Sequence, residues 1–187
     1  AATFEDFEGL IKTVESSEPR FVGARRVENR INYSEDLTKA PVYPIPGWSV
    51  QNGGTIDNAS TFTFAASNGS QLRQYIVYDL GETGAGTFAQ RVEVKGTAGQ
   101  KVRIGAGRAG QIFYSGDITL TGDWQLLGLT GTTTAGSSQW EYLIRNGSNG
   151  LVHTINVRKA QFEITTGQTN QNPSEYVSTG VGTGPEL

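Results

Sequence analysis

The chain has 187 residues, and 15 lysines and arginines against 18 aspartates and glutamates give it a net charge of −3. A protein that binds nucleic acid by neutralising phosphates needs a basic surplus, so no nucleic-acid partner is expected. The absence of cysteine excludes disulfides, thiolate nucleophiles and cysteine-ligated metals. No apolar run approaches the ~18 residues of a membrane-spanning helix, so no membrane partner is expected either.

Residues 1–27 form an N-terminal extension for which the pattern leaves two structures open. Phe4, Phe7, Ile11 and Val14 follow a helical spacing. However, glycine in the middle of this stretch costs about 1 kcal/mol relative to alanine in a helix, and "EDFEG" is typical of a turn between two short strands. A hairpin followed by a linker is the preferred prediction, and a helix is the alternative.

Residues 28–165 are predicted to be the folded domain. From about residue 48 onward, short apolar runs are separated by turn sequences such as "NGSNG" (146–150), and Asn-Gly steps allow the positive φ of tight hairpins. In "RVEVK", Val92 and Val94 share one face of a strand. Many short strands spaced by turns predict an all-β, antiparallel jelly-roll β-sandwich.

Residues 166–187 form a polar tail with Gly, Asn and Pro throughout. Such a segment has too little apolar surface to fold alone, so an extended C-terminal tail is predicted. Tyr176 and Val177 are the residues within it that we expect to dock on a neighbour.

Several segments resemble known protein classes. "FVGARRVENRINYSED" (21–36) and "GQTNQNPSEYVSTGV" (167–181) are similar to segments of tailed-bacteriophage virion proteins, those of head fibres, head spikes and tail fibres. Between them, "PGWSV" (46–50), "ITLTGDWQLLGLTGT" (118–132) and "INVRKAQFEI" (155–164) resemble strands of jelly-roll carbohydrate-binding modules.

The resemblance implies a jelly-roll domain on the virion surface. Its implied partners are other virion proteins, of the capsid or the tail, and host-surface polysaccharide. Fibres and spikes are often trimeric, so the resemblance also implies a homo-oligomer such as a trimer. The arginines of the first segment alternate with acids, and we interpret them as the junction into the domain rather than a polyanion site. Leu37 departs from the usual aromatic after "YSED", and "KAPVYPIP" (39–46) is a proline-rich insertion, so this surface is expected to differ from the family's.

Motifs of enzymes are weak in this sequence. "GAGRAG" (105–110) matches the glycine pattern of dinucleotide sites, but such a site needs a helix next, and "QIFYSGD" predicts strand and turn. His153 is the only histidine and lies in a strand-like run without a nucleophile motif, so a structural role is predicted. Glycoside hydrolysis needs only two carboxylates, yet nothing pairs the acids in sequence. We therefore predict a protein without enzymatic activity.

Aromatic residues are the best lead to a binding site. Sugar rings present apolar C–H faces that stack on Trp and Tyr, while amides and guanidinium groups bond to the hydroxyls. Trp140 follows a polar loop and is expected to be the most exposed tryptophan, whereas Trp48 and Trp124 are expected in the core. Tyr75 and Tyr78 face opposite ways in a strand, so only one can serve a given site. The predicted carbohydrate-binding residues are Trp140, Tyr114, Tyr78, Tyr75, Gln139 and Arg103.

A structural calcium ion is a candidate cofactor. Glu28, Asp36 and Glu163 lie near the first and last strands, which are neighbours in a jelly roll, and calcium takes carboxylate oxygens from separated segments. The competing interpretation is three ordinary surface acids.

These observations predict a phage virion surface protein, a fibre or capsid-decoration subunit that binds host-surface glycans for attachment without turning them over. The alternative is a purely structural cement or fibre-assembly protein that grips its neighbours with its termini and binds no sugar. Exposed aromatics along a groove favour the first, and ordered termini that wrap other chains favour the second.

Overall fold

The computed structural model describes residues 2–5, 11–14, 28–41, 47–76, 85–108, 110–134 and 139–179. Within these ranges the regular secondary structure consists of β-strands alone. The strands are β1 (Ala2–Glu5), β2 (Ile11–Val14), β3 (Trp48–Gln51), β4 (Thr55–Asn58), β5 (Thr61–Phe64), β6 (Gln71–Ile76), β7 (Gly86–Gly96), β8 (Lys101–Arg108), β9 (Gln111–Tyr114), β10 (Ile118–Thr119), β11 (Gln125–Thr133), β12 (Trp140–Asn146) and β13 (His153–Ile164).

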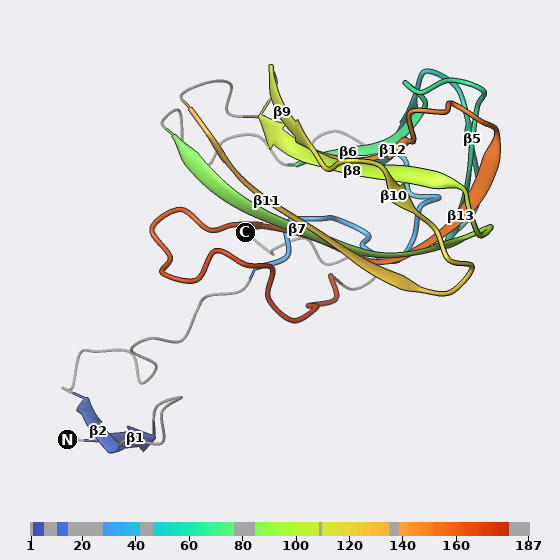
Figure 1. Ribbon diagram of the computed structural model, residues 1–187. Coiled ribbons are helices and arrows are strands. Elements are labelled where there is room, and N and C mark those ends of the chain that lie inside the picture. Colours follow the sequence, from blue (N-terminus) through green and yellow to red (C-terminus); the bar gives the residue numbers. More distant parts are fainter. Residues whose placement is uncertain are drawn as a thin grey trace.

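Strands β3 to β13 form two antiparallel sheets that pack face to face (Figure 1). The six-stranded sheet has the order β10–β8–β12–β6–β3, with β9 also paired to β8. The five-stranded sheet has the order β11–β7–β13–β5–β4. Strands that follow one another in the chain alternate between the two sheets, first over β5, β6, β7 and β8 and again over β11, β12 and β13. The predicted fold class, an all-β sandwich, is confirmed.

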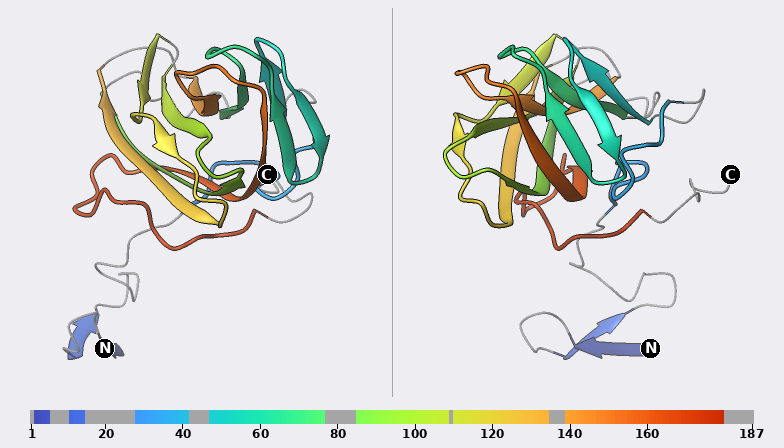
Figure 2. Two further views of the ribbon diagram at one scale, coloured as in Figure 1. Left: turned by 45° about the vertical axis from the view of Figure 1, so that its right-hand side comes forward. Right: turned by 90° about the vertical axis from the view of Figure 1, so that its right-hand side faces the viewer.

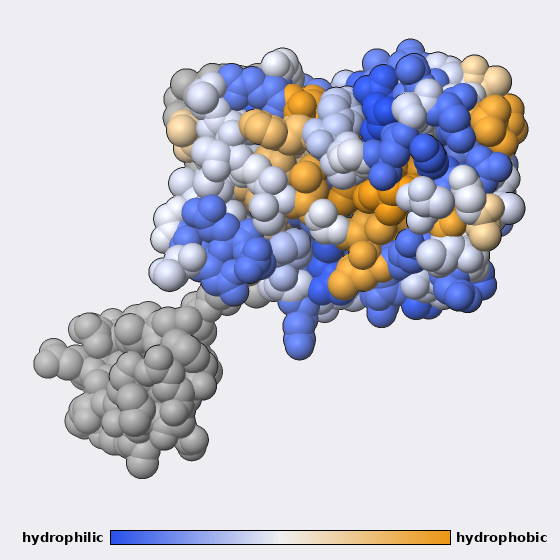
Figure 3. Space-filling view, viewed as in Figure 1, coloured by the Kyte–Doolittle hydropathy of each residue, from blue (hydrophilic) through white to orange (hydrophobic). Residues whose placement is uncertain are grey.

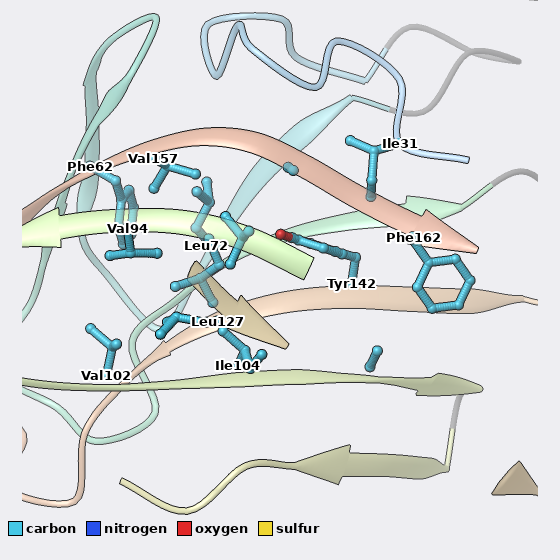
Figure 4. Close-up of a cluster of buried hydrophobic side chains, with 14 of the residues drawn as sticks. Ile31, Phe62, Leu72, Val94, Val102, Ile104, Leu127, Tyr142, Val157 and Phe162 are labelled. Carbon is cyan, nitrogen blue, oxygen red and sulfur yellow. The ribbon is translucent and has the colours of Figure 1, made fainter. Parts of the chain in front are cut away.

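The core lies between the two sheets and follows from alternation along each strand. Val92 and Val94 of β7 both point inward and are fully buried. Figure 4 shows side chains of both sheets meeting in this layer, where a large apolar side chain contributes roughly 1.5–3 kcal/mol on burial. Trp48 packs edge-on against Tyr142, with ring centroids 5.7 Å apart, and its indole N–H donates to the Tyr33 carbonyl at 2.9 Å. The predicted core position of Trp48 is therefore confirmed.

The N-terminal pair β1 and β2 is antiparallel, with Ala2 opposite Val14 and Glu5 opposite Ile11. The hairpin prediction is confirmed over the helical alternative. The agreement rests on the pairing of the two strands, since the connection between them lies outside the described residues.

The segment after β13 packs on the domain. Residues 173–179 run along the outer side of the five-stranded sheet, beside residues 28–36 (Figures 1 and 2). Asn29 joins the segments, because its amide N–H₂ donates to the Ala160 and Val177 carbonyls, both at 2.9 Å. Its side-chain oxygen accepts two backbone N–H groups. Asn29 thus uses its full hydrogen-bonding capacity and acts as a clasp that connects its own segment, residues 28–36, with β13 and the tail.

Further bonds hold the tail in place. The Ser174 N–H and hydroxyl both donate to one Glu163 oxygen at 2.9 Å, and the Val177 N–H donates to the Gln161 side chain at 2.6 Å. The Tyr176 hydroxyl lies 2.7 Å from the Ser34 hydroxyl. Tyr176, expected to dock on a neighbour, is thus hydrogen-bonded within its own chain.

Candidate functional site

The outward side chains of the six-stranded sheet form a polar and aromatic surface. On β6, Leu72 and Ile76 belong to the core. Arg73 and Tyr75 alternate with these inward residues along the strand and therefore point outward. Strand pairing extends the same alternation across the sheet. The six-strand face, as we call it, comprises Ser49, Gln51, Gln71, Arg73, Tyr75, Lys101, Arg103, Gly105, Gly107, Ile112, Tyr114, Glu141, Leu143 and Arg145.

Register arranges these residues in rows across the strands. Tyr75 is opposite Glu141. In the next row Arg73 is opposite Leu143, Leu143 is opposite Gly105, and Gly105 is opposite Tyr114. The strands that carry Tyr75 and Tyr114 are three spacings apart, about 14 Å at ~4.8 Å per strand. Two predicted site residues therefore lie on one surface, with polar groups between them.

Tyr114 lies directly over a glycine. A Cβ on Gly105 would come within 2.7 Å of Tyr114 Cδ1 and 2.8 Å of Cε1, so only a residue without a side chain lets the ring settle on the sheet at this point. The ring remains 40% exposed. The exposed part of the tyrosine ring can contact an apolar ring surface of a ligand.

Arg145 completes this side of the face. Its guanidinium carbon lies 5.1 Å from the centre of the Tyr114 ring, within the range of a cation–π contact. Its Nε donates to the Asn68 carbonyl at 2.7 Å. Leu143 is only 1% exposed although it points outward and lies outside the main core cluster, so the side chains of the six-strand face cover it.

Tyr75 has an arginine partner as well. The Arg73 guanidinium carbon lies 4.4 Å from the centre of the Tyr75 ring, and Arg73 Nη1 donates to the Gln51 side-chain oxygen at 3.1 Å. The Gln71 amide donates to the same oxygen at 2.6 Å. This glutamine–arginine chain fixes the guanidinium beside the half-buried tyrosine.

Glu141 is the carboxylate next to Tyr75. Burial raises its pKa, and the positive charge of Arg73 works against that rise. Glu141 is thus a partly buried carboxylate beside Arg73 and Tyr75.

Arg103, a predicted sugar contact, is engaged in an ion pair. Its Nε lies 2.6 Å from Asp117 Oδ1, and Lys101 Nζ lies 3.7 Å from Asp117 Oδ2. Ser148 donates to the same carboxylate through its hydroxyl and its backbone N–H. The Ser148 and Arg103 hydrogen bonds lower the pKa of Asp117 well below its ordinary value. Asp117 therefore stays ionised and occupies both cations.

Two tryptophan predictions are wrong. Trp140 is 1% exposed and packs in the core, with ring centroids 5.9 Å from Phe88 and 5.6 Å from Phe162. It starts β12 on the inward alternation, so it cannot stack on a ligand at the surface. Trp124 was assigned to the core but is 36% exposed, with the Arg158 guanidinium 4.0 Å from its ring. Trp124 therefore marks the opposite side of the molecule, on the five-stranded sheet.

The remaining predicted sugar contacts are Gln139 and Tyr78. Gln139 is half-buried and directly precedes Trp140 at the start of β12. Tyr78 lies outside the described residues.

The predicted calcium site is wrong, because its three acids serve separate local contacts. Glu28 pairs with Arg30 at 2.9 Å. Asp36 accepts from Thr38 at 2.6 Å and 3.0 Å. Glu163 is buried and binds the tail, as described above. Across the described residues, no group of three His, Cys, Asp or Glu side chains is arranged to hold a metal ion.

The motifs set aside as weak take structural roles. The "GAGRAG" run ends β8 and leads into β9, so strand and turn replace the helix that a dinucleotide site needs. His153 is buried against Phe64, with ring centroids 4.9 Å apart. Its Nδ1 lies 3.0 Å from the Leu151 carbonyl oxygen, and burial lowers its pKa.

Among the described residues no helix is long and apolar enough to cross a membrane.

Comparisons with known proteins identify no family. No protein-family model and no curated protein sequence matches the chain. Similar solved structures include a CBM29-2 mutant complexed with mannohexaose, at 10% identity and a TM-score of 0.49, covering 75% of this chain and 94% of that one. A CBM4 structure is 21% identical with a TM-score of 0.43, covering 65% and 81%. A bacteriophage CBA120 tailspike protein 4 structure is 13% identical with a TM-score of 0.46, covering 73% of this chain and 21% of that one. The chain is an all-β sandwich that resembles carbohydrate-binding modules in fold.

Proposed function

We propose that this protein binds carbohydrate on the six-strand face and does not cleave it. The observation that carries the proposal is the placement of Tyr114, packed against Gly105 and still 40% exposed. A second tyrosine, Tyr75, lies on the same face with its own arginine partner. Sugars are recognised by this combination of aromatic surfaces for their C–H faces and fixed polar groups for their hydroxyls.

The polar groups of the face are suited to that role. Gln51, Gln71 and Arg73 already form a connected chain of hydrogen bonds, so their orientation is set before a ligand arrives. Groups that are ordered in advance lose less entropy on binding than free side chains do. The same rigid arrangement gives the face selectivity among hydroxyl patterns.

The spacing of the acids supports the proposal of binding without catalysis. The carboxylates of the described face are Glu141 and, at its edge, Asp117. Asp117 binds Arg103, which is opposite Arg145, and Arg145 lies four residues along β12 from Glu141, about 13 Å at ~3.3 Å per residue. Glycoside hydrolysis uses carboxyl groups about 5–9.5 Å apart. Asp117 is also held in an ion pair, so it is a poor general acid or base.

We place this module on a phage virion surface, in support of host attachment, because of the two virion-like segments in the sequence. Other virion proteins and a homo-oligomeric assembly belong to the same proposal. Its test is to locate the protein in purified particles by labelling and electron microscopy. A capsid or tail position supports it, and absence from the particle contradicts it.

A purely structural role is the second candidate, favoured by exposed apolar surface. Figure 3 shows hydrophobic residues gathered in a band over β9, β10 and β11. Phe113 and Leu126, on β9 and β11, are 40% and 60% exposed. Apolar surface of this kind is typical of protein–protein contacts. If assembly is the function, Leu126→Ser will reduce self-association in sedimentation experiments while polysaccharide binding is absent from the unmodified protein.

Binding assays on a panel of bacterial surface polysaccharides test the main proposal. Tyr75→Ala and Tyr114→Ala are compared with Trp124→Ala, which removes an exposed, arginine-stacked aromatic from the other sheet. The proposal expects binding that both tyrosine variants weaken and the tryptophan variant leaves unchanged. No binding to any polysaccharide, or loss of binding only with Trp124→Ala, contradicts it.

A further inference from the structure

The six-strand face carries more positive charge than the chain as a whole. Four cations, Lys101, Arg73, Arg103 and Arg145, lie on it with two carboxylates, Glu141 and Asp117, which leaves a surplus of two positive charges. The entire chain has a net charge of −3. Positive charge is therefore concentrated on the surface that also presents the exposed tyrosines.

One charge of this surplus lies at Arg103 and Lys101, which share Asp117, and the other lies at Arg73 and Arg145 beside Glu141. Asp117 pairs with Arg103 and Lys101, whereas the hydrogen bonds that the structure shows for Arg73 and Arg145 go to neutral oxygens, a glutamine side chain and a backbone carbonyl. Arg73 and Arg145 thus keep donors and charge for an incoming anion.

The two arginines are also close together. Arg73 is opposite Leu143 on β12, and Arg145 is two residues further along that strand, which makes the two positions diagonal neighbours about 7–8 Å apart. Each guanidinium lies over a tyrosine ring, at 4.4 Å and 5.1 Å from the ring centres. A sugar that binds beside either ring therefore also lies close to the arginine that covers part of it.

We infer that the ligand of this face is an acidic polysaccharide whose sugar units carry carboxylates, with Arg73 and Arg145 as the groups that bind them. This inference rests on the proposed carbohydrate binding and adds the ligand class. Guanidinium presents paired N–H donors that match a carboxylate, and such charge-assisted bonds are stronger than neutral ones. A neutral glycan leaves these donors and charges without a matching partner.

Glu141 allows a test of whether charge on this face controls the affinity for an anionic ligand. It lies opposite Tyr75 and interacts electrostatically with Arg73, so its negative charge opposes an anionic ligand. Glu141→Gln is nearly isosteric and removes that charge. It is expected to tighten binding of an acidic polysaccharide several-fold.

The experiment compares matched polymers on the full chain. Polygalacturonate, alginate and hyaluronate are each tested beside the same polymer with its carboxylates reduced to alcohols, by affinity electrophoresis at fixed ionic strength. The variants are Arg73→Gln and Arg145→Gln, and the control is Arg158→Gln. Arg158 also stacks on an aromatic ring but belongs to the five-stranded sheet, so its replacement makes the same change in net charge elsewhere.

The inference expects at least one acidic polymer to bind roughly tenfold or more tightly than its reduced form. Arg73→Gln and Arg145→Gln are expected to remove most of that preference, and Arg158→Gln to leave it. If reduced polymers or neutral glycans bind as tightly as acidic ones, the acidic-ligand inference is overturned while carbohydrate binding stands. If Arg158→Gln removes the preference for the acidic polymer to the same extent, the inference is also overturned, because the preference then comes from unspecific attraction between charges. If no acidic, reduced or neutral polymer binds, the proposed function itself is overturned.

Discussion

Replacing Gly105 by alanine is expected to displace the Tyr114 ring and weaken polysaccharide binding while the sandwich stays folded. The new Cβ would lie 2.7 Å and 2.8 Å from two ring carbons and 3.1 Å from the Phe113 carbonyl oxygen. Non-bonded carbon atoms pack at about 3.5–4.0 Å, so the ring has to move by about 1 Å. Gly105 does not have a positive φ, and alanine therefore suits its backbone.

The size of the effect follows from what the ring contributes. Loss of one aromatic stacking contact costs roughly 0.5–1.5 kcal/mol, which corresponds to about a 2- to 12-fold weaker affinity. Crowding at β9 lowers the free energy of unfolding by about 1–3 kcal/mol, as for other small-to-large changes. Titration calorimetry with the tightest-binding panel polysaccharide measures the first quantity, and urea denaturation measures the second.

Gly116→Ala is the matched control, because a Cβ at Gly116 meets nothing within 4 Å. It is expected to bind and unfold like the unmodified protein. The reasoning is refuted if Gly105→Ala folds and binds normally while Tyr114→Ala loses affinity, because the position of the ring over the glycine then has no influence on binding.

The remaining predictions concern stability and the tail. Asn29→Ala removes the clasp and leaves buried backbone groups without partners, so we expect urea denaturation to show a loss of about 2–4 kcal/mol; a loss below about 0.5 kcal/mol contradicts that role. Because burial lowers the pKa of His153, the unfolded chain binds its proton first as the pH falls below about 6.5. The free energy of unfolding is therefore expected to drop between pH 7 and pH 5, and His153→Gln is expected to reduce that drop. If His153→Gln leaves the pH dependence of the free energy of unfolding unchanged, this explanation is contradicted. Ser174→Ala removes one of the two Ser174 bonds to Glu163, so faster proteolysis of the tail at an unchanged melting temperature is expected, and equal cleavage rates argue otherwise.

The strands and the fold class could be predicted because their signals are local. Asn-Gly turns and alternating runs such as the one with Val92 and Val94 determine where strands begin, end and face. The N-terminal hairpin followed from a single glycine in a turn sequence.

The binding face was predictable only in part. Tyr75 and Tyr114 were identified as aromatic residues at strand positions, but the sequence does not state which strands are neighbours. Arg73 lies beside Tyr75 on the same strand, but Arg145 reaches Tyr114 only because β12 pairs with β8 and β8 pairs with β9, which brings together residues 31 positions apart in the sequence. The available signal was alternation, since Arg73 is two residues before Tyr75 and so shares its side of the strand.

Burial of tryptophan was the weakest inference. Trp140 follows a polar loop, which suggested exposure, yet the first residue of a strand can already point inward. Trp124 sits in a pattern common to sandwich cores, but Arg158 of β13, which lies beyond β7 in the sheet, covers its ring from outside. Side-chain direction at a strand end depends on the pairing partner, which neither local sequence specifies.

A nuclear magnetic resonance titration tests the central claim most directly. An oligosaccharide fragment of the tightest-binding polysaccharide is added to isotope-labelled protein, and the shifts of backbone amide and aromatic signals are mapped. We predict that the largest shifts fall on β6, β9 and β12, around Tyr75 and Tyr114, with the Trp124 signals unmoved. Shifts centred on Trp124 and the five-stranded sheet, or no shifts at saturating concentration, would contradict the account.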